Sequence, residues 1–354
     1  MDWCGTDYSI YVMFTWPTQK RRNIAHKRIA LASILLILVL YVVLSWLLPH
    51  IPFSELVELP VHTPTRTVVS LSTFSQRVFH MRGCLDSIFA QSQFPDRVII
   101  TIPRKFRTLE PTARAHWHDI AVVPTLYNET EADMVAWFSD YVGVPAVYHV
   151  NVNAHRTSFV YDIGVLSLQF LDVDWGPGTK LVGALLLETH PDTVVITFDD
   201  DTVYHRDTVQ WLATHMQENI ALSFACEVWR TDRSGTICFG MWTDYDFLMI
   251  APRVCDGWLS GWTAVAYHVS SFGPDIWTFA ESLPAGCFNN DDMWLSAYIS
   301  RQGVTRIFAP NVVNHISHTR NLEYSLSTIV DHFDKSSSCA RAMFPATRQY
   351  LIGC

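Results

Sequence analysis

Three consecutive aspartates, Asp199, Asp200 and Asp201, follow the apolar run "TVVITF" at 193–198. Ionised carboxylates side by side repel one another unless a cation offsets their charge. Mn²⁺ and Mg²⁺ prefer oxygen ligands, and Mg²⁺ commonly keeps waters and shares phosphate oxygens with a substrate. The alternative is an acidic turn that caps a helix beginning near Arg206. The strand pattern before the acids and the helix pattern after them favour a metal–nucleotide site.

A second acidic pair, Asp291 and Asp292, follows two asparagines and opens the helical pattern "DDMWLSAYISRQG". Asn and Asp at the start of a helix satisfy free N–H groups and complement the helix dipole, which is a structural role. A carboxylate at this position is also held in place, as a general base must be. The two roles are compatible.

Two further groups of side chains have ligand-binding chemistry. The segment "NHISHTRN" places His315 and His318 after the last expected strand, "TRIFAP". The stretch "GWLSGWTAVAY" holds Trp258 and Trp262 beside glycines, and aromatic faces stack on the C–H faces of sugars. Packing is the alternative for both groups, because the chain has 13 tryptophans and 15 histidines.

The elements that would position these residues begin with a βαβ pattern. "TVVSLSTF" (67–74) and "RVIITIP" (97–103) are expected strands, and apolar residues between Val78 and Phe89 recur at helical spacing. This unit implies parallel strands. Further strands are expected at 120–124, 147–152 and 193–198, with a Gly/Pro turn at 174–180 and a helix at 181–189.

The first acidic cluster would therefore follow the carboxyl end of a strand, where open α/β sheets bind ligands. The second half of the chain is less regular and rich in aromatic residues, with one clear helix beginning near residue 289. We expect one mixed α/β domain, with a nucleotide-handling half at 67–205 and an acceptor-handling half at 206–320.

The segment Ile29–Leu48 is twenty residues without a charge. At ~1.5 Å per residue it spans roughly 30 Å, the thickness of a bilayer core. Five basic residues precede it, so the positive-inside rule leaves the N-terminus cytosolic. A cleaved signal peptide is the alternative, but the run is long and lacks a small-x-small cleavage pattern. The expected organisation is a cytosolic tail at 1–28, a transmembrane signal anchor at 29–48, a stem at 49–66 and a lumenal domain at 67–354.

Charge and cysteine content agree with this division. The first 28 residues carry a net charge of +3 against −9 for the whole chain, which leaves −12 for the rest and argues against a nucleic-acid partner. Seven of the eight cysteines follow the anchor without C-x-x-C spacing, which indicates disulfides. Cys226–Cys238, Cys255–Cys287 and Cys339–Cys354 are candidate pairs. A sequon at 128–130 fits a lumenal glycoprotein.

Together these stretches resemble nucleotide-sugar glycosyltransferases of the GT-A fold, a Rossmann-like mixed sheet with flanking helices. The likeness is to family-2-like, type II membrane enzymes and runs from Thr67 to His318. "FDDD" is similar to their D-x-D element, and "CFNNDDMWLSAYISRQG" to the motif with the catalytic base. "DWGPGTKLVGALL" resembles the segment before the D-x-D strand, and "VVSLSTFSQRVFHMRGCLDSIFAQSQFPDRVIITIP" the first nucleotide-binding βαβ unit.

The resemblance implies roles for individual residues. Asp201 would be the main metal ligand, Asp200 would contact the ribose, and Asp199 would support one or both. His315, with His318 as the alternative, would be a third metal ligand. Asp292 would be the catalytic base with Asp291 in support. The remaining candidates are Ser70, Thr73, Arg77, Asp174 and Lys180 for the nucleotide pocket, and Trp262 and Trp258 for the acceptor.

The implied activity is transfer of a sugar from a nucleotide-diphosphate donor, expected to be UDP-linked, to a glycan or glycoconjugate with Mn²⁺ or Mg²⁺. Inversion is favoured by the second acidic pair, while retention stays open. The implied compartment is the Golgi or ER membrane. Two alternatives remain: a nucleotidyltransferase, although no Gly-rich phosphate loop is present, and a membrane-tethered glycan-binding protein that keeps the fold without turnover.

Overall fold

The computed structural model describes residues 57–74, 77–104, 130–153, 156–231, 237–242, 251–310, 317–318, 339–340 and 342–343, together with Leu36 and Val39. The chain forms two units, Met1–Phe53 and Ser54–Cys354. Across the described residues, no helix has the length and apolar character needed to cross a bilayer. Most of the expected anchor at 29–48, the expected strand at 120–124 and His315 lie outside the described residues.

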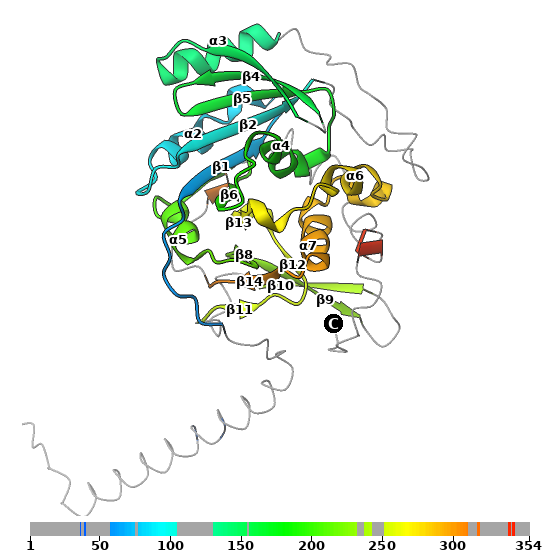
Figure 1. The fold of residues 1–354 in the computed structure, drawn as a ribbon. Coiled ribbons are helices and arrows are strands. Elements are labelled where there is room, and N and C mark those ends of the chain that lie inside the picture. Colours follow the sequence, from blue (N-terminus) through cyan, green and yellow to red (C-terminus); the bar gives the residue numbers. More distant parts are fainter. Residues whose placement is uncertain are drawn as a thin grey trace, which may run out of the picture. The chain divides into compact units, whose positions relative to one another are not determined.

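A ten-stranded mixed sheet forms the centre of the second unit (Figure 1). Its strands are β1 (Arg66–Ser72), β2 (Arg97–Pro103), β3 (Val147–Val152), β4 (Thr157–Ile163), β5 (Leu166–Leu171), β6 (Thr193–Thr197), β8 (Ile220–Ser223), β11 (Arg253–Val254), β13 (Val265–His268) and β14 (Thr305–Phe308). Their order is β11-β14-β8-β13-β6-β1-β2-β5-β4-β3. Both expected halves of the domain therefore contribute strands to one sheet.

The predicted βαβ unit is confirmed. β1 pairs parallel with β2 on one side and with β6 on the other. The connection holds a 3₁₀ turn, η2 (Val78–His80), and a helix, α2 (Arg82–Phe89), so the expected helix is interrupted at Met81. The inner residues of β1 and β2 are buried on both faces, which explains their nearly continuous apolar sequence.

Two apolar cores lie on opposite faces of this sheet. On one face, Val68 of β1 packs in a cluster with α4 (Thr179–Leu187), α6 (Ile276–Glu281) and α7 (Asp291–Arg301). On the other, Val69 and Leu71 pack in a cluster with α2, α3 (Glu131–Val142) and α5 (Thr208–His215). Alternate residues of one strand thus feed separate cores, as expected for a sheet covered on both faces by helices (Figure 1).

The far end of the sheet differs from the sequence-based expectation. β3 occupies its predicted residues but pairs antiparallel with β4, and β4 pairs antiparallel with β5. Neither β4 nor β5 was predicted from the sequence. β5 is buried along its whole length and so shows no alternation of polar and apolar residues. A short turn at Gly164, with a φ of 65°, joins the two strands. Such a positive φ suits glycine.

Local signals fix the ends of α3. Thr130 and Asp133 form a capping box: the Asp133 N–H donates to Thr130 Oγ1 (3.2 Å) and the Thr130 N–H to Asp133 Oδ2 (2.8 Å). The helix ends at Gly143 with a φ of 75°. The remaining elements are β7 (Thr202–Val203), β9 (Cys226–Thr231), β10 (Ile237–Trp242), β12 (Trp258–Leu259), β15 (Ser317–His318), η4 (Gly176–Gly178), η5 (Gly261–Thr263), η6 (Val269–Ser271) and η7 (Ala285–Cys287).

Among the described residues the disulfides are Cys226–Cys255 and Cys287–Cys339, so the three candidate pairs named from the sequence are wrong. The register of the β9–β10 hairpin explains one error. Cys238 lies opposite Arg230, four residues along the ladder from Cys226, or roughly 13 Å at the usual rise per residue. That separation is too long for a disulfide. Cys255 instead approaches Cys226 because β12, three residues later, pairs with β9.

Candidate active site

The first acidic cluster lies at the centre of the sheet. β6 and β1 are parallel neighbours, so both carboxyl ends meet at one edge. Phe198 continues this pairing with an N–H bond to the Ser70 carbonyl (2.9 Å), and Asp199 follows directly. The ring of Tyr204 stacks on Phe198 at 3.7 Å, and its hydroxyl accepts the Asp199 N–H at 2.7 Å. This packing closes the acidic turn and fixes where it begins.

Arg77 binds two of the three acids. Its Nη2 lies 2.6 Å from Asp200 Oδ1 and 2.8 Å from Asp201 Oδ2. Thr73 Oγ1 donates to the other oxygen of Asp200 at 2.7 Å. Burial raises the pKa of Asp200 to about 6, although Arg77 and Thr73 both favour its charged form. The arginine predicted for the nucleotide pocket therefore contacts the acidic cluster itself.

Lys180 joins the two acidic motifs. Its buried ammonium lies 2.7 Å from Asp199 Oδ1 and 3.0 Å from Asp291 Oδ2. Burial alone would lower the pKa of Lys180, but the neighbouring carboxylates outweigh that effect and hold the pKa well above its ordinary value. The hydroxyl of Ser70 donates to the Lys180 carbonyl and so ties the start of α4 to β1.

The second acidic pair opens α7, as predicted. Burial raises the pKa of Asp292 well above its ordinary value, and the adjacent charge of Asp291 raises it further. Burial also raises the pKa of Asp291, against the opposing effect of Lys180. The Gly261 N–H donates to the Asp292 carboxylate. A carboxyl group held in this way is suited to accept a proton nearer neutral pH than an exposed aspartate would.

Gly261 approaches this pair very closely. A Cβ at residue 261 would lie 2.6 Å from Asp292 Oδ1 and 3.0 Å from Lys180 Nζ. Any larger residue would therefore displace the carboxylate, the ammonium or both. This stretch was predicted to matter for its tryptophans, whereas in the structure the glycine between them makes the close contact with Asp292 and Lys180.

The cluster has more acids than bases. Five carboxylates, from Asp199–Asp201 and Asp291–Asp292, face the two cations Arg77 and Lys180. The outer side chains Asp199 and Asp201 are 30% and 35% exposed, while Asp200 is buried. This excess of carboxylates over cations, with two of the carboxylates partly exposed, fits a divalent cation.

The described residues provide few ligands for such an ion. Among the residues described by the structure, no group of three His, Cys, Asp or Glu side chains is arranged to hold a metal ion. Of the predicted metal ligands, the described residues include Asp201 and Asp199, and phosphate and water oxygens would complete the coordination. That is the usual habit of Mg²⁺ at phosphate sites. The predicted third ligand, His315, lies outside the described residues.

Other predicted residues lie elsewhere. Asp174 holds the turn before α4, where its carboxylate accepts the Gly176 N–H at 2.8 Å, and it lines a separate cavity. Trp258 is 1% exposed within the core and hydrogen-bonds Glu227, so in this structure it packs rather than presents a ring to an acceptor. Trp262 is partly exposed.

Two features of the site were not anticipated from the sequence. The Tyr204 hydroxyl accepts the Asp199 N–H and so holds the acidic turn, but its sequence position resembles an ordinary strand–helix connection. Glu227 is a carboxylate on β9 whose pKa is raised by burial, and Ser260 Oγ donates to it at 2.9 Å, one residue before Gly261. An acid between apolar residues in "FACEVW" was the available signal.

Comparisons with known proteins give distant structural likenesses only. No protein-family profile matches the chain, and no curated protein matches its sequence. The mannosyltransferase PcManGT from Pyrobaculum calidifontis, solved with GDP-Man and Mn²⁺, is 18% identical over 78% of this chain, with a TM-score of 0.41. This chain spans 62% of that protein's length.

Two other solved structures are similar in the same distant way. An active-site mutant of LgtC is 11% identical over 75% of this chain and 84% of its own, with a TM-score of 0.31. WbbM, a bifunctional glycosyltransferase in its apo form, is 12% identical over 81% of this chain and 47% of its own, with a TM-score of 0.32. At such scores the functional argument rests on the geometry of the acidic cluster.

Proposed function

We propose that this protein is a metal-dependent glycosyltransferase that moves a sugar from a nucleotide-diphosphate donor to a glycan or glycoconjugate. The donor that we propose is a UDP-sugar. One observation supports the transferase activity above all: the acids after β6 and the acids opening α7 meet across Lys180, at 2.7 Å and 3.0 Å. Sugar transfer needs one group to hold a charged leaving diphosphate and a second to accept a proton. With a metal ion bound on the donor side, the two acidic motifs would supply these in one place.

On the donor side, Asp201 and Asp199 would hold Mn²⁺ or Mg²⁺, with Asp200 toward the ribose. When bound, that ion would offset the negative charge that develops on the departing diphosphate. Arg77 and Lys180 lie among the same carboxylates and add fixed positive charge to the diphosphate side. Ser70 and Thr73 hold this arrangement from β1.

On the acceptor side, Asp292 would take the proton of the attacking hydroxyl. The hydroxyl oxygen forms a bond to the anomeric carbon from the face opposite the diphosphate, and the bond from that carbon to the diphosphate oxygen breaks. The configuration at the anomeric carbon inverts. The raised pKa of Asp292 suits a general base, and the Gly261 N–H orients its carboxylate.

We place the catalytic domain in the lumen of the Golgi or ER, behind the apolar segment at 29–48. The disulfides Cys226–Cys255 and Cys287–Cys339 support an oxidising compartment. Protease protection in sealed microsomes tests this: the lumenal domain stays intact until detergent is added. Digestion without detergent would contradict this location.

Turnover with a donor panel tests the activity. Release of nucleoside diphosphate is measured with UDP- and GDP-sugars and a mixture of glycan acceptors, in Mn²⁺ or Mg²⁺ and then with a chelator. We expect release from one donor and a loss of at least ~10²-fold on chelation. An equal rate of nucleoside diphosphate release with and without the chelator would contradict a metal-dependent transferase. Binding of donors without any release would also contradict it and would favour a glycan-binding protein.

A further inference from the structure

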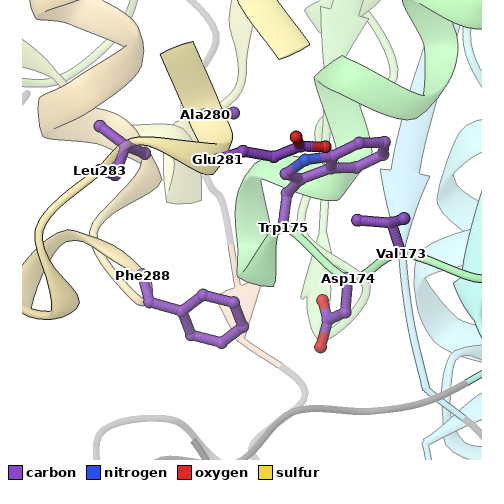
Figure 2. Close-up of a pocket in the computed structure, with 7 residues that line it drawn as sticks. All are labelled: Val173, Asp174, Trp175, Ala280, Glu281, Leu283 and Phe288. Atoms are coloured by element: carbon purple, nitrogen blue, oxygen red, sulfur yellow. The ribbon is translucent and has the colours of Figure 1, made fainter. Parts of the chain in front are cut away.

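A cavity at the turn before α4 has the lining of a sugar subsite. It has a volume of about 260 Å³ and lies between the turn before α4 and the segment from α6 to η7 (Figure 2). Its lining residues are Val173, Asp174, Trp175, Ala280, Glu281, Leu283 and Phe288. Resting on the proposed transferase activity, we infer that this cavity binds a neutral sugar ring of the substrate.

The chemistry of the lining selects for such a ring. Trp175, Phe288 and Leu283 offer apolar surface to the C–H face of a sugar, and Asp174 and Glu281 offer carboxylate oxygens to its hydroxyls. Glu281 also pairs with Arg156, so its charge is partly offset. A mostly apolar wall with a few converging polar groups is the usual composition of a small-ligand site. None of the described residues that line the cavity is basic. The Asp174 carboxylate therefore disfavours a phosphate and favours an uncharged, hydroxyl-rich group.

One buried donor in this wall needs a partner. The side chain of Trp175 is 5% exposed, and its indole N–H has no hydrogen-bond partner among the described residues. Figure 2 shows the nitrogen edge of this ring turned toward the α6 side of the cavity. This nitrogen has almost no accessible surface, and an unsatisfied buried donor is costly, so a small shift of the ring that exposes its N–H to a hydroxyl oxygen of a bound sugar would be favoured.

The two walls of the cavity continue along the chain into the elements that carry Lys180 and Asp291. The turn that carries Asp174 and Trp175 continues into α4 and Lys180, and Phe288 lies three residues before Asp291. The two walls touch, because a Cβ at Gly176 would lie 2.3 Å from the Phe288 carbonyl oxygen. The Cys287–Cys339 disulfide anchors the residue before Phe288. A ring in this cavity is thus held on a rigid frame shared with the acids.

The ring has two possible sources, the donor's own sugar or the acceptor. Ala280→Leu would fill the cavity from α6, since Ala280 is buried and lines it. Asp174→Asn removes the charge and keeps an oxygen for the Gly176 N–H, so it serves if the first variant folds poorly. Asp172→Asn is the matched control, because Asp172 is an exposed carboxylate two residues away that does not line the cavity.

Calorimetric dissociation constants of three ligands test the inference: the bare nucleoside diphosphate, the intact sugar nucleotide and short neutral methyl glycosides. We expect the bare nucleotide to bind Ala280→Leu and Asp172→Asn as it binds the wild type. Affinity for one ring-bearing ligand should fall about tenfold or more in Ala280→Leu and Asp174→Asn but not in Asp172→Asn. A loss confined to the sugar nucleotide identifies the donor's sugar, and a loss for the glycosides identifies the acceptor.

The inference would be overturned if every ring-bearing ligand bound Ala280→Leu and Asp174→Asn with the same affinity as it binds Asp172→Asn. So would a wild-type protein that binds no ring better than its bare nucleotide and binds no glycoside. Failure of the transferase proposal is separate, because it appears as absent turnover in the wild-type protein. Glycoside binding lost in Ala280→Leu would still establish a sugar site in that case.

Discussion

At the scale of single residues, the site is organised around two cations. Arg77 holds Asp200 and Asp201, and Lys180 holds Asp199 and Asp291. A buried charge without a partner is expensive, so each cation fixes the carboxylates that it contacts. The environments within the cluster differ, because Asp200 is buried against Arg77 and Thr73 whereas Asp201 is partly exposed.

Substituting Asp292 tests the base. Asp292→Asn keeps the shape of the side chain and removes its ability to accept a proton, so we expect turnover to fall ~10²–10⁴-fold. Nucleotide affinity should stay within about twofold, because the donor-side residues are untouched. Turnover by nucleotide release and affinity by calorimetry are the measurements, with Asp172→Asn at an exposed carboxylate as the control. Wild-type turnover in Asp292→Asn would refute the assignment.

The raised pKa of Asp292 also predicts how stability depends on pH. A carboxyl whose pKa is higher in the folded state than in the unfolded state ionises more readily on unfolding, so its contribution to stability is present at low pH and lost as pH rises. Asp292→Asn should therefore melt at a higher temperature than the wild type at pH 7. The difference should vanish near pH 4, around the unfolded pKa. Thermal melts without metal across this range measure it; an equal or lower melting temperature at pH 7 would contradict the prediction.

The base also sets the acid limb of the rate profile. Because Asp292 acts as its carboxylate, kcat/KM should fall as pH drops through its raised pKa, at pH values above the ordinary aspartate range. The measurement is kcat/KM for transfer between pH 4 and pH 8, compared with the affinity for bare nucleotide. An acid limb at the ordinary value of an exposed aspartate would show that burial does not tune this group.

At the scale of elements, η5 and α7 place the base against Lys180. Gly261→Ala would put a Cβ 2.6 Å from Asp292 Oδ1, so we expect kcat to fall ~10²-fold in a folded protein. Gly143→Ala at the end of α3 is the control for loss of a glycine: it strains a backbone with a φ of 75°, which Gly261 does not have, but no atom lies within 4 Å of the new Cβ. Turnover and melting temperature are measured for both. Equal turnover in the two variants would contradict the close packing of η5 on the base.

The sequence predicted the elements with strong local patterns. β2 and β3 occupy the residues expected of them, and α7 begins at the predicted acids. β5 was missed because it is buried throughout and so lacks the alternation that marks a strand. The contact of Lys180 with both acidic motifs could not be predicted, because it depends on how α4 and α7 pack on one face of the sheet.

At the scale of the whole molecule, two disulfides connect segments that the sheet does not join. Cys287–Cys339 closes a separation of 52 residues and lies just before the wall residue Phe288 and α7. Removing such a link costs roughly 2–5 kcal/mol. Cys287→Ser with Cys339→Ser should therefore lower the melting temperature and turnover together, while Cys84→Ser, at a buried free thiol, serves as the control.

Thermal melts with and without reductant measure this effect. The wild type should lose stability on reduction, and the double variant should respond less. Unchanged melting of the double variant would show that the link contributes nothing to the fold.

The central claim is that the acidic turn after β6 binds a divalent cation together with the diphosphate of a sugar nucleotide. Anomalous diffraction from crystals soaked with Mn²⁺ and UDP tests it most directly. We predict a manganese peak against Asp201 and Asp199, bridged to the diphosphate oxygens. Crystals that show neither ion nor nucleotide at this turn, with the Arg77 and Lys180 ion pairs intact, would contradict the claim.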